Sequence, residues 1–201
     1  MTKLNTEDSP KESPIYLLKS GDTFNGFQVG ALLHEGGMSY LYQVAHPDGR
    51  IPLILKVPKL EGYGPLSSFV AFETETRILA HLKGYFFPRV VGLGEVSRMP
   101  YILMEHVPGC TLSQAIERAP VSIDELVALM VPVCKALQVL HQHNVIHLDL
   151  KPDNILNRTD GSVVLTDFGL SHHSRIPDMM DAAFGENEGS IPYIAPEQIH
   201  H

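Results

Sequence analysis

Short apolar runs separated by turn residues fill the first half of the chain. Turn signals between them include Glu35-Gly36-Gly37 and His46-Pro47-Asp48-Gly49. The runs are rich in Val, Ile, Leu and Tyr and have the length of strands. They cover Phe27–Leu33, Leu41–Ala45, Leu53–Val57, Val90–Val96 and Tyr101–Val107. We therefore predict a five-stranded sheet, with 46–49 as a hairpin turn between its second and third strands.

One segment inside this series has helical spacing. Apolar residues between Ser67 and Leu82 recur every three or four positions, which is typical of a helix with one buried face. The residues predicted to form that face are Phe69, Phe72, Thr76, Ile78 and Leu79.

The second half of the chain, after Pro108-Gly109, has mainly helical spacing. It predicts a short helix over Ser113–Arg118 and a long one over Ser122–His143. Ser122 and Glu125 have the spacing of a capping box at the start of the long helix. Short strands follow, around Asn154–Asn157 and Val163–Thr166.

Composition and charge predict a disordered tail and argue against nucleic acid and membrane as partners. The first 14 residues are rich in Ser, Thr, Pro, Lys and Glu, so we predict a disordered tail over residues 1–20. A net charge of −8 argues against a nucleic-acid footprint and a polybasic membrane anchor. No apolar run reaches the roughly 18 residues of a membrane span.

The cysteines and histidines indicate no metal site or disulfide. Cys110 and Cys134 lie far apart in the sequence, so we expect them to be free thiols, as in a cytoplasmic protein. The 11 histidines lack HExxH spacing, and we interpret them as scattered surface residues.

Three motifs occur in order in the second half. The segment 147–154 has the sequence HLDLKPDN; Asp167-Phe168-Gly169 follows, and then Ala195-Pro196-Glu197. Together they resemble the catalytic loop, magnesium loop and APE motif of the protein kinase family. The resemblance is to eukaryotic-like (Hanks-type) serine/threonine kinases of bacterial type. It implies an α+β, two-lobe fold, with an N-lobe and hinge over 21–107 and a partial, mainly helical C-lobe over 108–201.

The resemblance assigns roles to the residues of these motifs. Asp149 would accept or orient the proton of the substrate hydroxyl, and Lys151 would face the transferring phosphate. Asn154 and Asp167 would supply oxygen ligands to Mg²⁺, with Mn²⁺ as an alternative. Lys151 and Ser190, which lies at the Thr position of the family's GTxxY stretch, favour Ser/Thr over Tyr as the acceptor.

The first half supplies counterparts of the ATP-binding residues. Leu53-Ile54-Leu55-Lys56 resembles the VAIK strand, so Lys56 would contact the α- and β-phosphates of ATP. Glu75 is its expected helix partner, and Glu73 is the alternative.

The adenine site is also implied by the resemblance alone. Met104 would be the gatekeeper, and the backbones of Glu105 and Val107 would bind the base. Apolar residues expected around the nucleotide are Leu33, Leu41, Ile54 and Leu156. Those expected in the regulatory spine are Leu79, Leu93, His147 and Phe168.

Two stretches depart from the family pattern. In the phosphate loop, Gly36 and Gly37 are present, but His34 and Ser39 replace the first and third glycines of G-x-G-x-x-G. Leu148 replaces the Arg that gathers an activation-loop phosphate in regulated kinases. We therefore expect activity that is independent of activation-loop phosphorylation, and unchanged by phosphatase treatment.

The predicted function is ATP-dependent phosphorylation of protein Ser/Thr hydroxyls. The alternatives are a pseudokinase or truncated nucleotide-binding module, and a small-molecule phosphotransferase sharing HxDxxxxN. Because the sequence ends soon after Glu197, we expect one face of the 122–143 helix to be partly uncovered and the chain on its own to fold poorly or turn over weakly.

Overall fold

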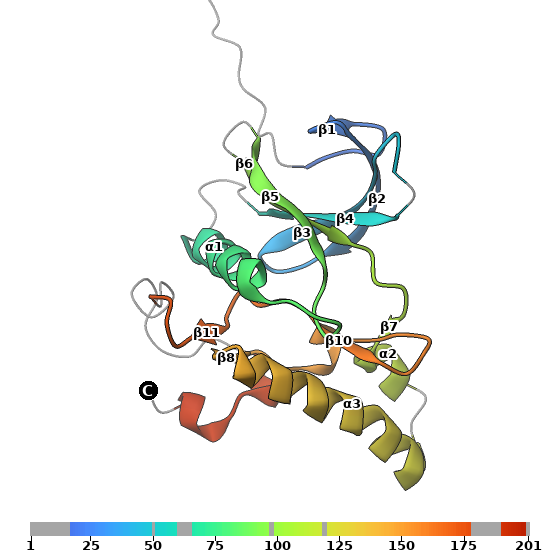
Figure 1. The fold of residues 1–201 in the computed structure, drawn as a ribbon, viewed down its shortest axis with the longest axis vertical. Coiled ribbons are helices and arrows are strands. Elements are labelled where there is room, and N and C mark those ends of the chain that lie inside the picture. The colour runs from blue at the N-terminus through green and yellow to red at the C-terminus, as the bar shows by residue number, and fades with distance from the viewer. Residues whose placement is uncertain are drawn as a thin grey trace, which may run out of the picture.

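A curved antiparallel sheet forms the first half of the molecule. The computed structural model describes residues 17–49, 51–59, 66–96, 99–117, 120–177 and 190–199. The six strands have the order β1-β2-β3-β4-β6-β5 (Figure 1). They are β1 (Thr23–Phe24), β2 (Phe27–Glu35), β3 (Ser39–Ala45), β4 (Leu53–Pro58), β5 (Val90–Val96) and β6 (Met99–Glu105). All five predicted strands are present, and the two-residue β1 adds an edge that apolar runs do not reveal.

The second half is built around one long helix that lies below the sheet in Figure 1. Two small antiparallel sheets, β10-β9-β7 and β11-β8, accompany it. The helices are α2 (Leu112–Ile116) and α3 (Ile123–Gln142), with 3-10 turns at Pro152–Asn154, Ile191–Tyr193 and Pro196–Ile199. The strands are β7 (Cys110–Thr111), β8 (Val145–Ile146), β9 (Ile155–Asn157), β10 (Val163–Leu165) and β11 (His172–His173).

Helix α1 (Leu66–His81) forms where the spacing predicts a helix and packs against β4 and β5, but one residue of its predicted buried face is exposed. Phe69 is 44% exposed, so its predicted place on that face is wrong. Buried Ser68 and Glu75 take part in the inner face, together with Phe72 and Leu79. The spacing of apolar residues alone does not reveal this face, because Ser68 and Glu75 are polar.

Two apolar clusters form the core, and one of them joins the two halves. One lies within the sheet half, and the other joins α1, the inner strands, α3 and β10. The first contains Phe24, Val29, Tyr40, Tyr42, Val44, Leu53, Leu55, Val57, Met99 and Leu103. Leu18, inside the predicted tail, packs against it; residues 1–16 of that tail lie outside the described residues.

The long helix α3 begins as predicted. The Ser122 side chain accepts a hydrogen bond from the Glu125 N–H, and the Glu125 carboxylate accepts one from the Ser122 N–H, which completes the capping box. One apolar face of α3 remains open, with Ile123 79% and Val127 53% exposed, as expected. None of the helices in the described ranges is both long and apolar enough to cross a membrane.

A glycine fixes the contact between the link after β6 and strand β9. Gly109 has φ +153°, and a Cβ at this position would lie 2.3 Å from the carbonyl oxygen of Asn157. Only glycine permits so close an approach of two backbones. It thereby allows Cys110 in β7 to pair with Asn157 in β9.

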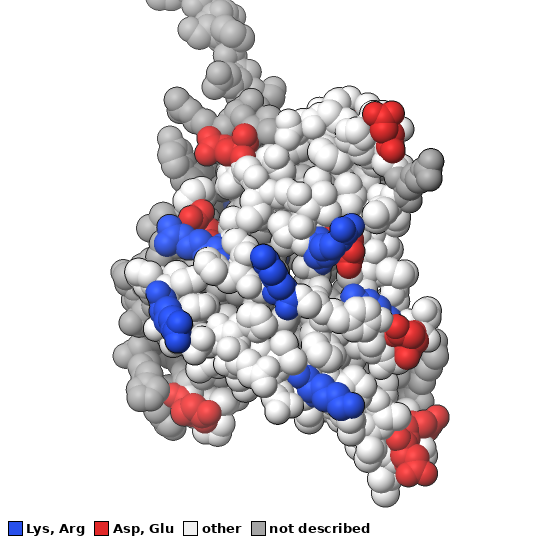
Figure 2. Space-filling model, viewed as in Figure 1, with Lys and Arg blue, Asp and Glu red and all other residues white. Residues whose placement is uncertain are grey.

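Charged side chains are interspersed on the face drawn in Figure 2. Basic side chains lie mainly across the middle of this face, and acidic ones lie beside them and toward its upper and lower ends. The overall balance of the chain is acidic, with a net charge of −8.

Candidate active site

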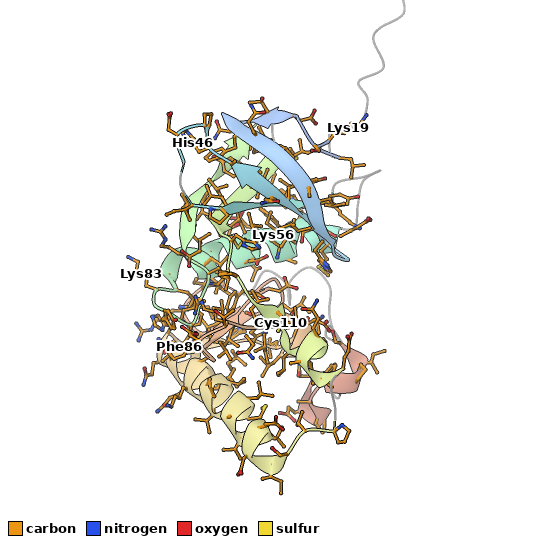
Figure 3. The ribbon with its side chains drawn as sticks, turned by 90° about the vertical axis from the view of Figure 1, so that its right-hand side faces the viewer. Lys19, His46, Lys56, Lys83, Phe86 and Cys110 are labelled. Carbon is orange, nitrogen blue, oxygen red and sulfur yellow. The ribbon has the colours of Figure 1, made fainter. Side chains whose placement is uncertain are left out.

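A buried cation lies beneath the sheet, between the two halves (Figure 3). Lys56, on β4, donates to Glu75 Oε2 on α1 at 2.5 Å and to Asp167 Oδ1 at 3.0 Å. Glu73 instead forms an exposed pair with Arg77 at 2.9 Å, so Glu75 is the partner of Lys56. The segment after β10 is thus joined to the sheet and to α1 through a single ammonium group.

The three charges shift one another's protonation. Burial disfavours the charged form of Lys56, but the carboxylates of Asp167 and Glu75 outweigh it and raise its pKa. The positive charge of Lys56 lowers the pKa of Asp167. Burial raises the pKa of Glu75, against the opposing effect of Lys56. Asp167 is the outward-facing carboxylate of this cluster, because its side chain is 49% exposed.

A second polar cluster surrounds Asp149 in the loop after β8. Lys151 Nζ lies 2.8 Å from Asp149 Oδ2 and 2.7 Å from Ser190 Oγ, and the Ser190 N–H donates to Asp149 Oδ1 at 3.0 Å. Asn154 Nδ2 donates to the Asp149 carbonyl oxygen at 2.8 Å and to Oδ2 at 3.2 Å. Asp149 is therefore held in one orientation by two residues of its own motif and by Ser190.

Backbone contacts bring the two clusters together. The Thr166 N–H donates to the Asn154 carbonyl at 3.0 Å. Asp167, the next residue, is thereby held beside the loop that contains Asp149. His147 Nε2 lies 3.0 Å from the Thr166 carbonyl oxygen, and its ring is 5.2 Å from that of Phe168. Burial lowers the pKa of His147, so its neutral form donates through Nε2.

Two residues of this junction have left-handed backbone conformations. Leu148 has φ +60° and Asp167 φ +63°. Such conformations cost on the order of 1–3 kcal/mol for residues other than glycine and persist where surrounding contacts enforce them. For Asp167, this restraint comes from its hydrogen bond with Lys56 and from the bond of the preceding Thr166 N–H to the Asn154 carbonyl.

The structure places the predicted adenine-site residues on several strands. Leu41 pairs with Lys56, and Ile54 lies two residues before Lys56, so all three share one face of the sheet. Met104 pairs with Ile54 and is buried, whereas Leu33 is 44% exposed at a register shift.

The remaining predicted base-binding residues lie at the link between the halves and in the lower sheet. The Glu105 N–H donates to the Arg89 carbonyl at 3.0 Å. Val107 is buried just beyond β6. Leu156 is half-buried in β9, in the β10-β9-β7 sheet.

The predicted phosphate loop is the turn between β2 and β3. The Gly36 N–H donates to the Ser39 carbonyl at 2.9 Å and closes the turn. Gly37 has open space around the position of a Cβ, and neither glycine has a positive φ. His34 is exposed on β2 and pairs with Leu41.

Some supporting residues are not apparent from the motifs. Gln198 donates to the Leu148 carbonyl at 3.1 Å, and Ser171 donates to the His147 carbonyl at 3.0 Å. A Cβ on Gly169 would lie 3.3 Å from the Cβ of Ala71, so this glycine permits close packing against α1. Only the proximity of Gln198 to the APE motif could have indicated its involvement.

Asn154 and Asp167 form a donor set suited to a hard divalent cation. Both hydrogen bonds of the Asn154 side chain use its amide nitrogen, which leaves its carbonyl oxygen as a ligand. Asp167 offers the carboxylate oxygen that does not bind Lys56. Amide and carboxylate oxygens are ligands that Mg²⁺ prefers. Within the described ranges, no cluster of three or more His, Cys, Asp or Glu residues could hold a metal ion, so water and phosphate oxygens would have to complete such a site.

The fold and this pair of clusters define the protein kinase class. The family model for the protein kinase domain matches residues 27–201, and the chain belongs to that family.

Relatives with known names lie among bacterial kinases. The serine/threonine-protein kinase PknL of Mycobacterium bovis is 32% identical over 86% of this chain and 43% of its own length. A probable serine/threonine-protein kinase PknB of Lactococcus lactis is 32% identical over 82% of this chain and 26% of its own length. The PknI kinase domain of Mycobacterium tuberculosis matches in structure with a TM-score of 0.61 at 28% identity, over 76% of this chain and 63% of that one. The chain thus spans less than half the length of these two curated relatives.

Proposed function

We propose that this chain transfers the γ-phosphate of ATP to Ser or Thr hydroxyls of protein substrates. The observation that carries the proposal is the junction of the two clusters: Lys56 bound to Glu75 and Asp167, beside Asp149 bound to Lys151 and Ser190. Bacterial relatives named as serine/threonine kinases support it. In this proposal residues 21–107 act as the nucleotide-binding lobe and hinge, and residues 108–201 as part of the substrate lobe, in the cytoplasm.

Phosphoryl transfer requires positioning and charge neutralisation more than covalent chemistry by the enzyme. Asp149 would orient the acceptor hydroxyl and take its proton as the new P–O bond forms and ADP leaves. Lys151, held between Asp149 and Ser190, would offset negative charge on the transferring group. Lys56 would hold the α- and β-phosphates, and the Leu41–Ile54 face would cover the adenine above Leu156.

A divalent cation would be held by Asn154 and Asp167. Bound Mg²⁺, or Mn²⁺ in its place, would supply positive charge that offsets the negative charge of the phosphates. Asn154 would have two tasks: its amide nitrogen fixes Asp149, and its oxygen would hold the ion.

A transfer assay tests the proposal. Radiolabelled ATP with Mg²⁺ and a protein substrate rich in Ser and Thr should give phosphoserine or phosphothreonine, and D149N should reduce the rate by at least about 100-fold, the typical contribution of a general base. D153N, which changes a neighbouring carboxylate outside the cluster, is the matched control. Transfer that persists in D149N contradicts the assigned role.

The second candidate is a nucleotide-binding module without transfer. The replacement of two phosphate-loop glycines by His34 and Ser39 favours it. ATP with Mg²⁺ that raises the melting temperature, with no phosphate transferred, would establish this alternative, because a ligand that binds only the folded state stabilises it.

A further inference from the structure

His34 lies in a row of side chains that ends at the buried cation. In the register of the sheet, His34 in β2 pairs with Leu41 in β3, which pairs with Lys56 in β4. Residues opposite each other in antiparallel strands project from the same face. His34 is therefore on the face of Lys56, and two strand spacings separate them by about 10 Å.

The imidazole is directed along the inner face of the loop tip. His34 and Gly36 are two residues apart and share this face. His34 Nε2 lies 3.4 Å, and its Cδ2 3.6 Å, from the position that a Cβ on Gly36 would occupy. A side chain at 36 would therefore compete with the ring for space, and the absence of one leaves room for the imidazole at the tip.

Glu35, the acidic neighbour of His34, lies on the opposite face of the sheet. Glu35 pairs with Tyr40, whose ring belongs to the apolar cluster of the sheet, and its carboxylate binds Lys59 at 2.7 Å. The charged groups that face the row from other elements are Lys56 of β4, Glu75 of α1 and Asp167 after β10. An anion extending from Lys56 toward the loop tip thus meets an exposed hydrogen-bond donor.

We propose that His34 is a phosphate-binding residue, whose ring N–H donates to the β- or γ-phosphate of the nucleotide held at Lys56. The inference rests on the proposed function, because the nucleotide defines the anion. A kinase phosphate loop offers backbone N–H groups at glycines; here a side-chain donor takes the place of one glycine.

Calorimetric titration of the chain with ATP·Mg, ADP·Mg and adenosine tests this inference. H34A should weaken ATP and ADP binding about tenfold, the scale of a hydrogen bond to a charged group, and leave adenosine binding unchanged. H34K should retain most of the ATP affinity. H46A is the matched control, because His46 lies at the opposite end of the sheet from the loop (Figure 3).

Each other outcome has a definite meaning. An equal loss for adenosine would assign His34 to the shape of the loop, and a gain of affinity in H34A would show that the ring obstructs the nucleotide. Unchanged ATP binding in H34A would overturn the inference while leaving the proposed function intact. A parent chain that binds none of the three ligands would overturn both.

Discussion

The Asp149 loop and the β2–β3 turn contribute to the same centre but are held very differently. Asp149 is buried and receives hydrogen bonds from Lys151, Asn154 and Ser190. The turn is exposed and is held by the Gly36–Ser39 backbone bond and the Glu35–Lys59 pair. We call the part held by buried hydrogen bonds around Asp149 the rigid half, and the part around the β2–β3 turn, which we propose covers the phosphates, the adaptable half.

Removal of the junction cation should have the largest effect. K56M leaves Glu75 buried without its partner, which should lower the free energy of unfolding by about 3–5 kcal/mol. The K56M/E75L double variant should recover most of this loss, because it leaves no unpaired charge at positions 56 and 75. Urea denaturation of both variants measures the difference, and a single variant as stable as the parent chain would show that the Lys56–Glu75 pair contributes little to the free energy of unfolding.

Within the rigid half, the Ser190 hydroxyl should affect the rate of phosphate transfer rather than the melting temperature. S190A removes the 2.7 Å bond to Lys151 but keeps the backbone bond to Asp149. We expect phosphate transfer to slow about tenfold, as for the loss of one charge-assisted hydrogen bond, with an unchanged melting temperature. S190T should restore the rate, and failure of this rescue would exclude the hydroxyl as the cause.

The pH dependence of stability should also originate in the rigid half. Burial lowers the pKa of His147 in the folded state, so the unfolded chain takes up this proton first as the pH falls. Its contribution to stability is complete above the ordinary histidine pKa of about 6.5 and is lost as the pH falls through the lowered value. H147Q should therefore flatten the fall in unfolding free energy between pH 7.5 and pH 5. Parallel curves for H147Q and the parent chain would contradict this origin.

The smallest effect should come from the adaptable half. K59A removes the exposed pair with Glu35 and the contact with the Tyr40 ring. Exposed ion pairs contribute about 0–1 kcal/mol to stability, so the free energy of unfolding should fall by less than about 1 kcal/mol. A larger loss, measured by the same urea titration, would mean that the turn is held as firmly as the Asp149 loop.

The sequence predicted the parts of this centre that are contiguous. The candidate residues of the 147–154 motif and of the strand that contains Lys56 lie within a few positions of one another, and the capping box at Ser122 is local as well. Contacts that depend on folding were missed. Gln198 reaches Leu148 across 50 positions, and the buried face of α1 includes Ser68, which no apolar periodicity identifies.

Gly109 has a consequence for any saturation mutagenesis of this chain. Every other residue there would drive a Cβ into the Asn157 carbonyl, so replacements should inactivate the protein although the position contributes no side-chain chemistry. Its mutational profile would therefore resemble that of Asp149. A binding measurement and a folding measurement, made on the same G109A sample, are needed to separate a geometric requirement of the chain from a chemical one.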